Sequence, residues 1–172
     1  MEKIKILALV TVIVLFLFGC GAEESVPLDC FEGELKSELS WSVNGERIRA
    51  IVILGNKGQE ERDISVEFIE PESLCGVRVE RTGGKTSSYI GDTVFDGGDI
   101  SHWLCVETLF DVDGNIVRSE SVRMRGEEAY YAEIERPGAE RLCVYISKQS
   151  GAPIKLIAGE LEADVIYFNV RS

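Results

Sequence analysis

The sequence has little basic charge and very little histidine. Its 172 residues include 18 Lys and Arg against 30 Asp and Glu, which gives a formal net charge of −12. Because phosphate binding needs clusters of Lys and Arg, this acidity argues against a nucleic-acid partner. His102 is the single histidine of the chain, which excludes sites built on two or more imidazoles.

Helical periodicity is also missing. No segment of eleven or more residues shows convincing helical spacing of apolar residues, and no clear internal repeat or low-complexity tract is present. The hydrophobic fraction of 45% is nevertheless too high for a disordered chain. The length suits one domain with a real core, so the sequence predicts a folded domain without long helices.

The first 22 residues differ in composition from the rest of the chain. Lys3 and Lys5 precede an uncharged apolar run over residues 6–18, and Gly19 and Cys20 follow it. A basic start, a short apolar run and a small residue are typical of a secretory signal. The run is short for a bilayer-spanning helix, which needs about 20 residues.

The segment Leu17-Phe18-Gly19-Cys20 resembles the lipobox of prokaryotic lipoproteins, although a small residue is usual at the position of Phe18. The resemblance implies that Cys20 receives a diacylglyceryl group and becomes the first residue after cleavage. It implies a signal peptide over 1–19, a lipid-anchored tether over 20–34 and a domain over 35–172 on the extracytoplasmic face of the cell membrane. The alternative is an uncleaved apolar anchor over 6–22, which places the same domain outside the cytoplasmic membrane.

Four cysteines remain if Cys20 is lipidated, and disulfides persist outside the cytoplasm. Three connectivities are possible, of which we favour Cys30–Cys75 with Cys105–Cys143. The second pair is favoured because alternation places each cysteine on the mixed face of a predicted strand. Buried free thiols are the alternative. No Cys-x-x-Cys pair is present, so we expect no zinc site.

Beyond the tether, apolar residues alternate with a period of two, and turn signals such as Asn44-Gly45 and Asp113-Gly114 separate the runs. This pattern predicts around nine antiparallel strands arranged as a sandwich. A weak further strand is expected within 89–95. The predicted strands cover residues 35–43, 47–54, 63–69, 76–81, 103–110, 115–124, 129–135, 141–147 and 162–170.

Part of this pattern resembles the immunoglobulin-like modules of prokaryotic cell-surface proteins. Two alternating runs over 51–54 and 64–68 flank an Asn-Lys-Gly turn, and Pro137-Gly138 later precedes another strand over 142–146. The resemblance implies an all-β, antiparallel immunoglobulin-like β-sandwich, a fold that carries no single activity. Residues 70–101 have no counterpart in it.

The motifs that carry chemistry are weak. Residues 83–87, Gly-Gly-Lys-Thr-Ser, lack the first glycine of a phosphate-binding loop and predict a plain turn. His102 follows a serine, but no Gly-x-Ser-x-Gly motif is present. Asp92, Asp96 and Asp99 could supply oxygen ligands to calcium, although acidic glycine-rich loops are common without metal. We therefore expect no catalytic residue, no cofactor and no metal.

The sequence thus predicts a non-catalytic binding or interaction module, whose partner is another envelope protein or an external ligand. The alternatives are an enzyme or calcium-dependent domain that uses the 82–102 loop, or a protease inhibitor that presents a loop. An exposed aromatic residue could anchor a peptide or a sugar. The candidates are Trp41, Trp103, Tyr130, Tyr131, Tyr145 and Tyr167.

The lipid anchor gives the first testable prediction. Substituting Cys20→Ser removes the acylated sulfur, so the protein should leave the membrane fraction or persist as an unprocessed precursor. Intact-mass measurement of the wild-type mature chain checks the same point. A mature chain that starts at any residue other than Cys20 contradicts the prediction.

Overall fold

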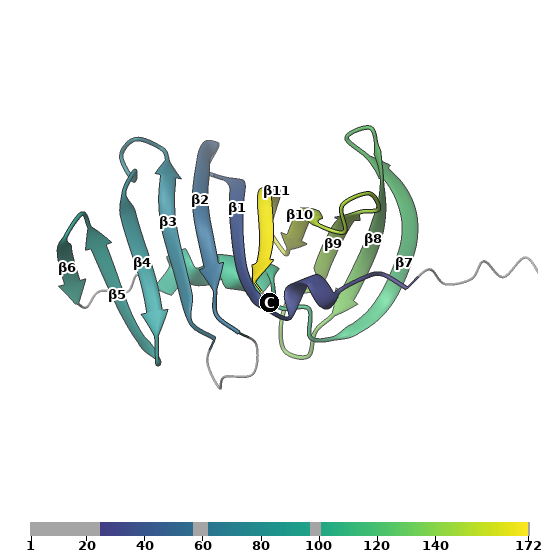
Figure 1. Cartoon of the computed structure of the whole chain (residues 1–172), viewed down its shortest axis with the longest axis horizontal. Helices are drawn as coiled ribbons and strands as arrows, with labels where there is room; N and C mark the ends of the chain where they lie inside the picture. Colours follow the sequence, from purple (N-terminus) through teal and green to yellow (C-terminus); the bar gives the residue numbers. More distant parts are fainter. Residues whose placement is uncertain (1–24, 57–61, 97–100, 172) are drawn as a thin grey trace, which may run out of the picture.

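The computed structural model describes residues 25–56, 62–96 and 101–171, so the predicted signal peptide and Cys20 lie outside the described residues. The regular structure of the described chain is mainly antiparallel strand (Figure 1). None of the helices in these ranges is long and apolar enough to span a membrane. The elements in chain order are η1 (Asp29–Phe31), β1 (Glu34–Val43), β2 (Glu46–Leu54), β3 (Ile64–Glu70), β4 (Val77–Thr82), β5 (Lys85–Ile90), β6 (Thr93–Asp96), η2 (Ser101–Leu109), β7 (Asn115–Met124), β8 (Glu127–Glu135), β9 (Leu142–Ser147), β10 (Pro153–Ala158) and β11 (Leu161–Arg171).

All eleven strands belong to one sheet, in the order β6-β5-β4-β3-β2-β1-β11-β10-β9-β8-β7 (Figure 1). The prediction of an all-β antiparallel fold is therefore confirmed. The predicted two-sheet immunoglobulin-like sandwich is not found, because β1, near the start of the chain, pairs with β11 at its end and joins the two halves of the sheet. No strand was predicted for β10, which completes this continuous sheet.

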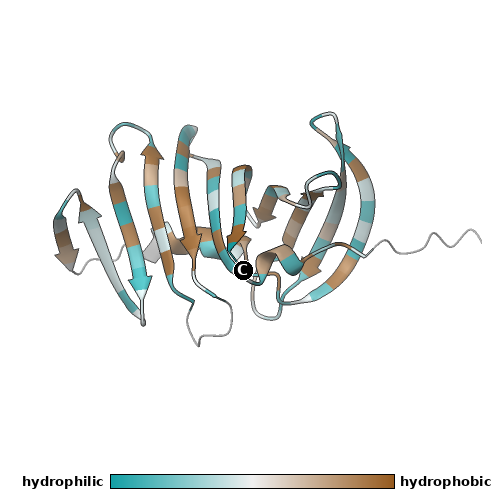
Figure 2. Ribbon diagram, viewed as in Figure 1, coloured by the Kyte–Doolittle hydropathy of each residue, from teal (hydrophilic) through white to brown (hydrophobic). Residues whose placement is uncertain are grey.

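The sheet has an inner face that holds the core and an outer face that is polar, as the alternation of hydropathy along the strands shows (Figure 2). On β1 and β2, registered inner pairs such as Leu39 with Ala50 and Leu35 with Leu54 are buried. The outer face carries ion pairs between neighbouring strands, among them Arg49 with Glu38. Ion pairs that remain partly exposed to solvent add little stability, so the inner face provides most of the free energy of folding.

The helix η2 covers the inner face and takes the place of a second sheet. Residues 103–110 were predicted as a strand, but Ser101–Leu109 form a 3-10 helix with Val106 and Leu109 buried. Trp103, Val106 and Leu109 recur every third residue, which suits the three residues per turn of a 3-10 helix. Trp103 packs edge-on against Phe68 of β3, with ring centroids 4.9 Å apart. A short apolar run fits both the period of a strand and that of a helix. Here the segment forms a helix, which covers the apolar face of the sheet.

The turns are mostly those predicted. Asn44 and Gly45 have φ of +52° and +83° and close the β1–β2 hairpin, as Asn-Gly sequences favour. Gly83 joins β4 to β5 in a plain turn, again with positive φ. The predicted hairpin about Asp113-Gly114 is wrong, since the chain before it is η2 rather than a strand.

The segment predicted as a tether is partly core. Phe31 in η1 is fully buried, and its ring lies 6.4 Å from Phe110 and 5.9 Å from Phe168. Val26 is buried as well. Val26 and Phe31 therefore belong to the hydrophobic core.

Two arginines fasten η2 to the sheet. Arg81 of β4 binds the carboxylate of Glu107 at 2.7 Å. Arg136, whose side chain is 3% exposed, donates to the carbonyls of Thr108 at 2.6 Å, Asp111 at 3.2 Å and Glu140 at 2.8 Å. Helix ends leave main-chain carbonyls without partners, and Arg136 supplies donors to the end of η2.

The substitution Arg136→Met should lower the free energy of unfolding by roughly 3 kcal/mol, because three main-chain carbonyls lose a charged donor. The matched control is Arg123→Met, since Arg123 is an exposed residue that donates to the nearby Gly126 carbonyl. That control should change stability by less than about 0.5 kcal/mol. Urea unfolding monitored by tryptophan fluorescence measures both, and equal midpoints for the two variants would contradict the role assigned to Arg136.

Candidate binding site between β10 and β11

The two halves of the sheet separate along β11. Four residue pairs, from Lys155 with Asp164 to Ala158 with Leu161, join β10 to β11. Beyond them the register of β11 against β1 shifts, with Ile166 as the extra residue. The register of β10 against β9 also shifts, around Ile154. Bulges bend strands and end pairing, so two bulges at the same level direct β10 away from β11.

This separation leaves one edge of β11 open. From Val165 to Arg171, β11 pairs only with β1 among the residues that the structure describes. The end of that edge is covered, because Gly33 lies against Val170 and the Arg171 carbonyl. The uncovered part is therefore residues 165–168, which we call the β11 gap edge.

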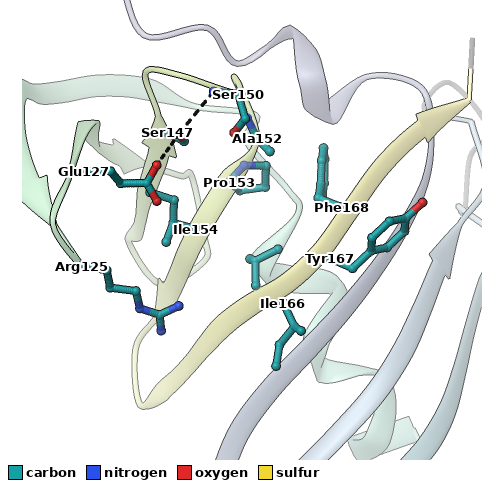
Figure 3. Close-up of a pocket in the computed structure, with 11 residues that line it drawn as sticks. Arg125, Glu127, Ser147, Ser150, Ala152, Pro153, Ile154, Ile166, Tyr167 and Phe168 are labelled. Atoms are coloured by element: carbon teal, nitrogen blue, oxygen red, sulfur yellow. Dashed lines mark hydrogen bonds between the residues drawn. The ribbon is translucent and has the colours of Figure 1, made fainter.

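A pocket of about 250 Å³ lies beside the β11 gap edge (Figure 3). Apolar side chains of β10 and β11 form one part of its wall, and polar side chains around the β7–β8 turn and the loop after β9 form the other. Ile166 and Tyr167 are 50% and 49% exposed. The lining residues are Arg125, Glu127, Ser147, Ser150, Ala152, Pro153, Ile154, Val165, Ile166, Tyr167 and Phe168.

The polar part of the wall is internally bonded. The hydroxyl of Ser147 donates to Glu127 at 2.7 Å, and the Ser150 main-chain N–H donates to the Ser147 oxygen at 3.3 Å. At the rim, Arg125 pairs with Asp164 at 2.5 Å. Ser147 therefore donates to a carboxylate and has no histidine beside it among the described side chains, which is the geometry of a rigid wall rather than of an activated nucleophile.

A second pocket, of about 350 Å³, has an acidic wall, and two of its carboxylates are paired with basic side chains. Ser40, Trp41, Ser42, Glu160, Glu162 and Asp164 line it. Lys155 pairs with Glu162, and Arg125 pairs with Asp164. Within the described ranges no three His, Cys, Asp or Glu side chains converge as metal ligands.

The four cysteines predicted to form disulfides are free thiols in the structure. Cys105 lies in η2, and Cys143 lies on the outer face of β9, with its sulfur 3.4 Å from the Tyr131 hydroxyl. The prediction that Cys105 and Cys143 lie on neighbouring strands is therefore wrong. The pairing Cys30–Cys75 stays a prediction for non-reducing peptide mapping.

The environment of two thiols favours the protonated form. Burial raises the pKa of Cys30 to about 11, and burial also raises the pKa of Cys105. Because the thiolate is the reactive form, neither cysteine is prepared for nucleophilic attack at neutral pH.

The structure describes only part of the 82–102 segment on which the alternative functions depend. This segment holds the β5–β6 hairpin and the start of η2. Asp92 is exposed in the turn of that hairpin. Asp99 and the side chains of Asp96 and His102 lie outside the described part. The described residues therefore assemble neither a calcium site nor a catalytic triad.

Of the aromatic residues considered for binding, Tyr167 lines the pocket, whereas Trp41 is 6% exposed and belongs to the core. The sequence showed Tyr167 only as one member of an alternating run. No sequence signal marked the pocket itself, because it results from where two strands stop pairing.

No family model and no curated protein matches the chain. Several solved structures are similar in shape. An uncharacterized conserved protein from Thermus thermophilus is 17% identical with a TM-score of 0.49, over 84% of this chain and 82% of that one. A putative outer membrane lipoprotein-sorting protein domain from Vibrio parahaemolyticus is 9% identical with a TM-score of 0.42, over 84% and 89%. MucB in the Pseudomonas aeruginosa MucA/MucB complex is 13% identical with a TM-score of 0.46, over 84% and 54%. Since all three TM-scores are below 0.5, these similarities assign no function to the chain.

Proposed function

We propose that this chain is a lipid-anchored protein of the extracytoplasmic face of the cell membrane, which binds a partner without catalysis at the β11 gap edge. The observation that carries the site is the uncovered strand edge over 165–168, beside a pocket with a partly apolar wall. The lipobox-like segment ending at Cys20 supports the location.

Two features support binding rather than chemistry. The polar groups of the pocket wall bond one another, as Ser147 does with Glu127. The apolar groups, in contrast, are left exposed where Ile166 and Tyr167 meet solvent. Exposed apolar side chains beside a concave surface are typical of an interaction site.

The test compares two isoleucine substitutions in the full-length lipoprotein. Ile166→Glu places a charge at the gap edge. Ile53→Glu places the same charge on β2, which is paired on both sides and where Ile53 is 37% exposed. Pull-down from solubilised membranes should recover a partner with the wild type and with Ile53→Glu. Recovery with Ile166→Glu should be at least about tenfold lower, because binding of the partner would bury the new carboxylate without an opposite charge. Equal recovery with both variants would contradict binding at this site.

A further inference from the structure

The open edge of β11 presents main-chain hydrogen-bonding groups. In an antiparallel strand, successive residues direct their N–H and C=O groups to alternate edges, so part of the main chain over 165–168 faces the gap. Among the described residues, the main chain of this segment pairs with β1 and with no other strand. Open strand edges are templates for another extended chain, which supplies the complementary donors and acceptors.

We infer that the ligand of this site, if the proposed function holds, is an extended segment of polypeptide that adds to the β11 gap edge as a strand. The size of the pocket supports a peptide over an enclosed small molecule. Its volume of about 250 Å³ is below the roughly 300–1,000 Å³ of typical small-molecule sites.

The length of the added strand is bounded at both ends. Pairing of Lys155 with Asp164 closes one end of the gap. Gly33, which lies against Val170, closes the other. The open stretch of four residues corresponds to about 13 Å of strand. A peptide of about four or five residues therefore fills it.

The walls indicate which side chains the peptide carries. Side chains of an added strand alternate between the two faces of the sheet. One set meets apolar residues of the pocket wall, Pro153, Ile154 and Phe168. The other set meets solvent, on a chain with a net charge of −12. A peptide in which apolar residues alternate with polar or basic residues therefore suits both the pocket wall and the solvent-facing side.

The two outer edges of the sheet do not offer the same template. β6 has four residues, and short edge strands pair poorly with other chains. β7 is long, but it carries a bulge between Ile116 and Arg118, and it bears the charged residues Arg118, Glu120 and Arg123. Such features protect an edge from pairing, whereas the β11 gap edge has no charged side chain.

The probe is the peptide acetyl-Lys-Val-Thr-Val-Lys-amide, titrated into the full-length protein in detergent micelles and followed by NMR chemical-shift changes of the backbone amides. Two analogues are compared with it, one N-methylated at both valines and the other at the threonine and the last lysine. Because only alternate amides of an added strand face the protein, one analogue should bind at least about tenfold more weakly, and the other should bind within about threefold of the parent.

The variants locate the effect. Binding of the parent peptide should be lost in Ile166→Glu and kept in Ile53→Glu. Equal binding of both analogues, or binding that survives Ile166→Glu, overturns strand addition at this edge, as does no binding of the parent peptide. The pull-down test of the proposed function does not depend on the peptide, so its success together with any of these results shows that the site binds its partner in another way.

Discussion

The junction of β10 with β11 is the constraint on which the rest of the structure depends. Four residue pairs hold the half of the sheet that contains β1 to β6 against the half that contains β7 to β9. The bulges around Ile154 and Ile166 end this pairing. The same two bulges therefore limit the junction and open the gap, so the candidate site follows from the way in which the sheet is closed.

The inner face shows how a single sheet builds a core without a second one. Its apolar residues are covered by η2 and η1, through contacts such as Trp103 with Phe68 and Phe31 with Phe168. The cover is fixed by polar anchors at two places, Arg81 with Glu107 and Arg136 with the carbonyls at the end of η2. A 3-10 helix is not stable alone, so these anchors and the buried side chains keep it in place.

The local structure could be predicted better than the arrangement. Alternation located most strands, and the Asn44-Gly45 turn fixed the first hairpin, because both signals depend on neighbours in sequence. The identity of η2 could not be predicted, since Trp103, Val106 and Leu109 fit a helix and their neighbours fit a strand. The β11 gap edge could not be predicted from the sequence for a different reason. It depends on the register between strands that are far apart in the chain. Tyr167 was recognised as a candidate aromatic, but nothing in its sequence context marked an unpaired edge.

The candidate binding site depends most directly on the open edge of β11, and residue-resolved hydrogen exchange of the full-length protein measures it. Amides of Ala163 and Asp164 lie between β1 and β10 and should be protected close to the level of global unfolding. Among residues 165–168, the amides that point away from β1 should exchange at least about a hundredfold faster, because they lack a partner strand. Uniform slow exchange along the whole of β11 would contradict the open edge and the binding site built on it.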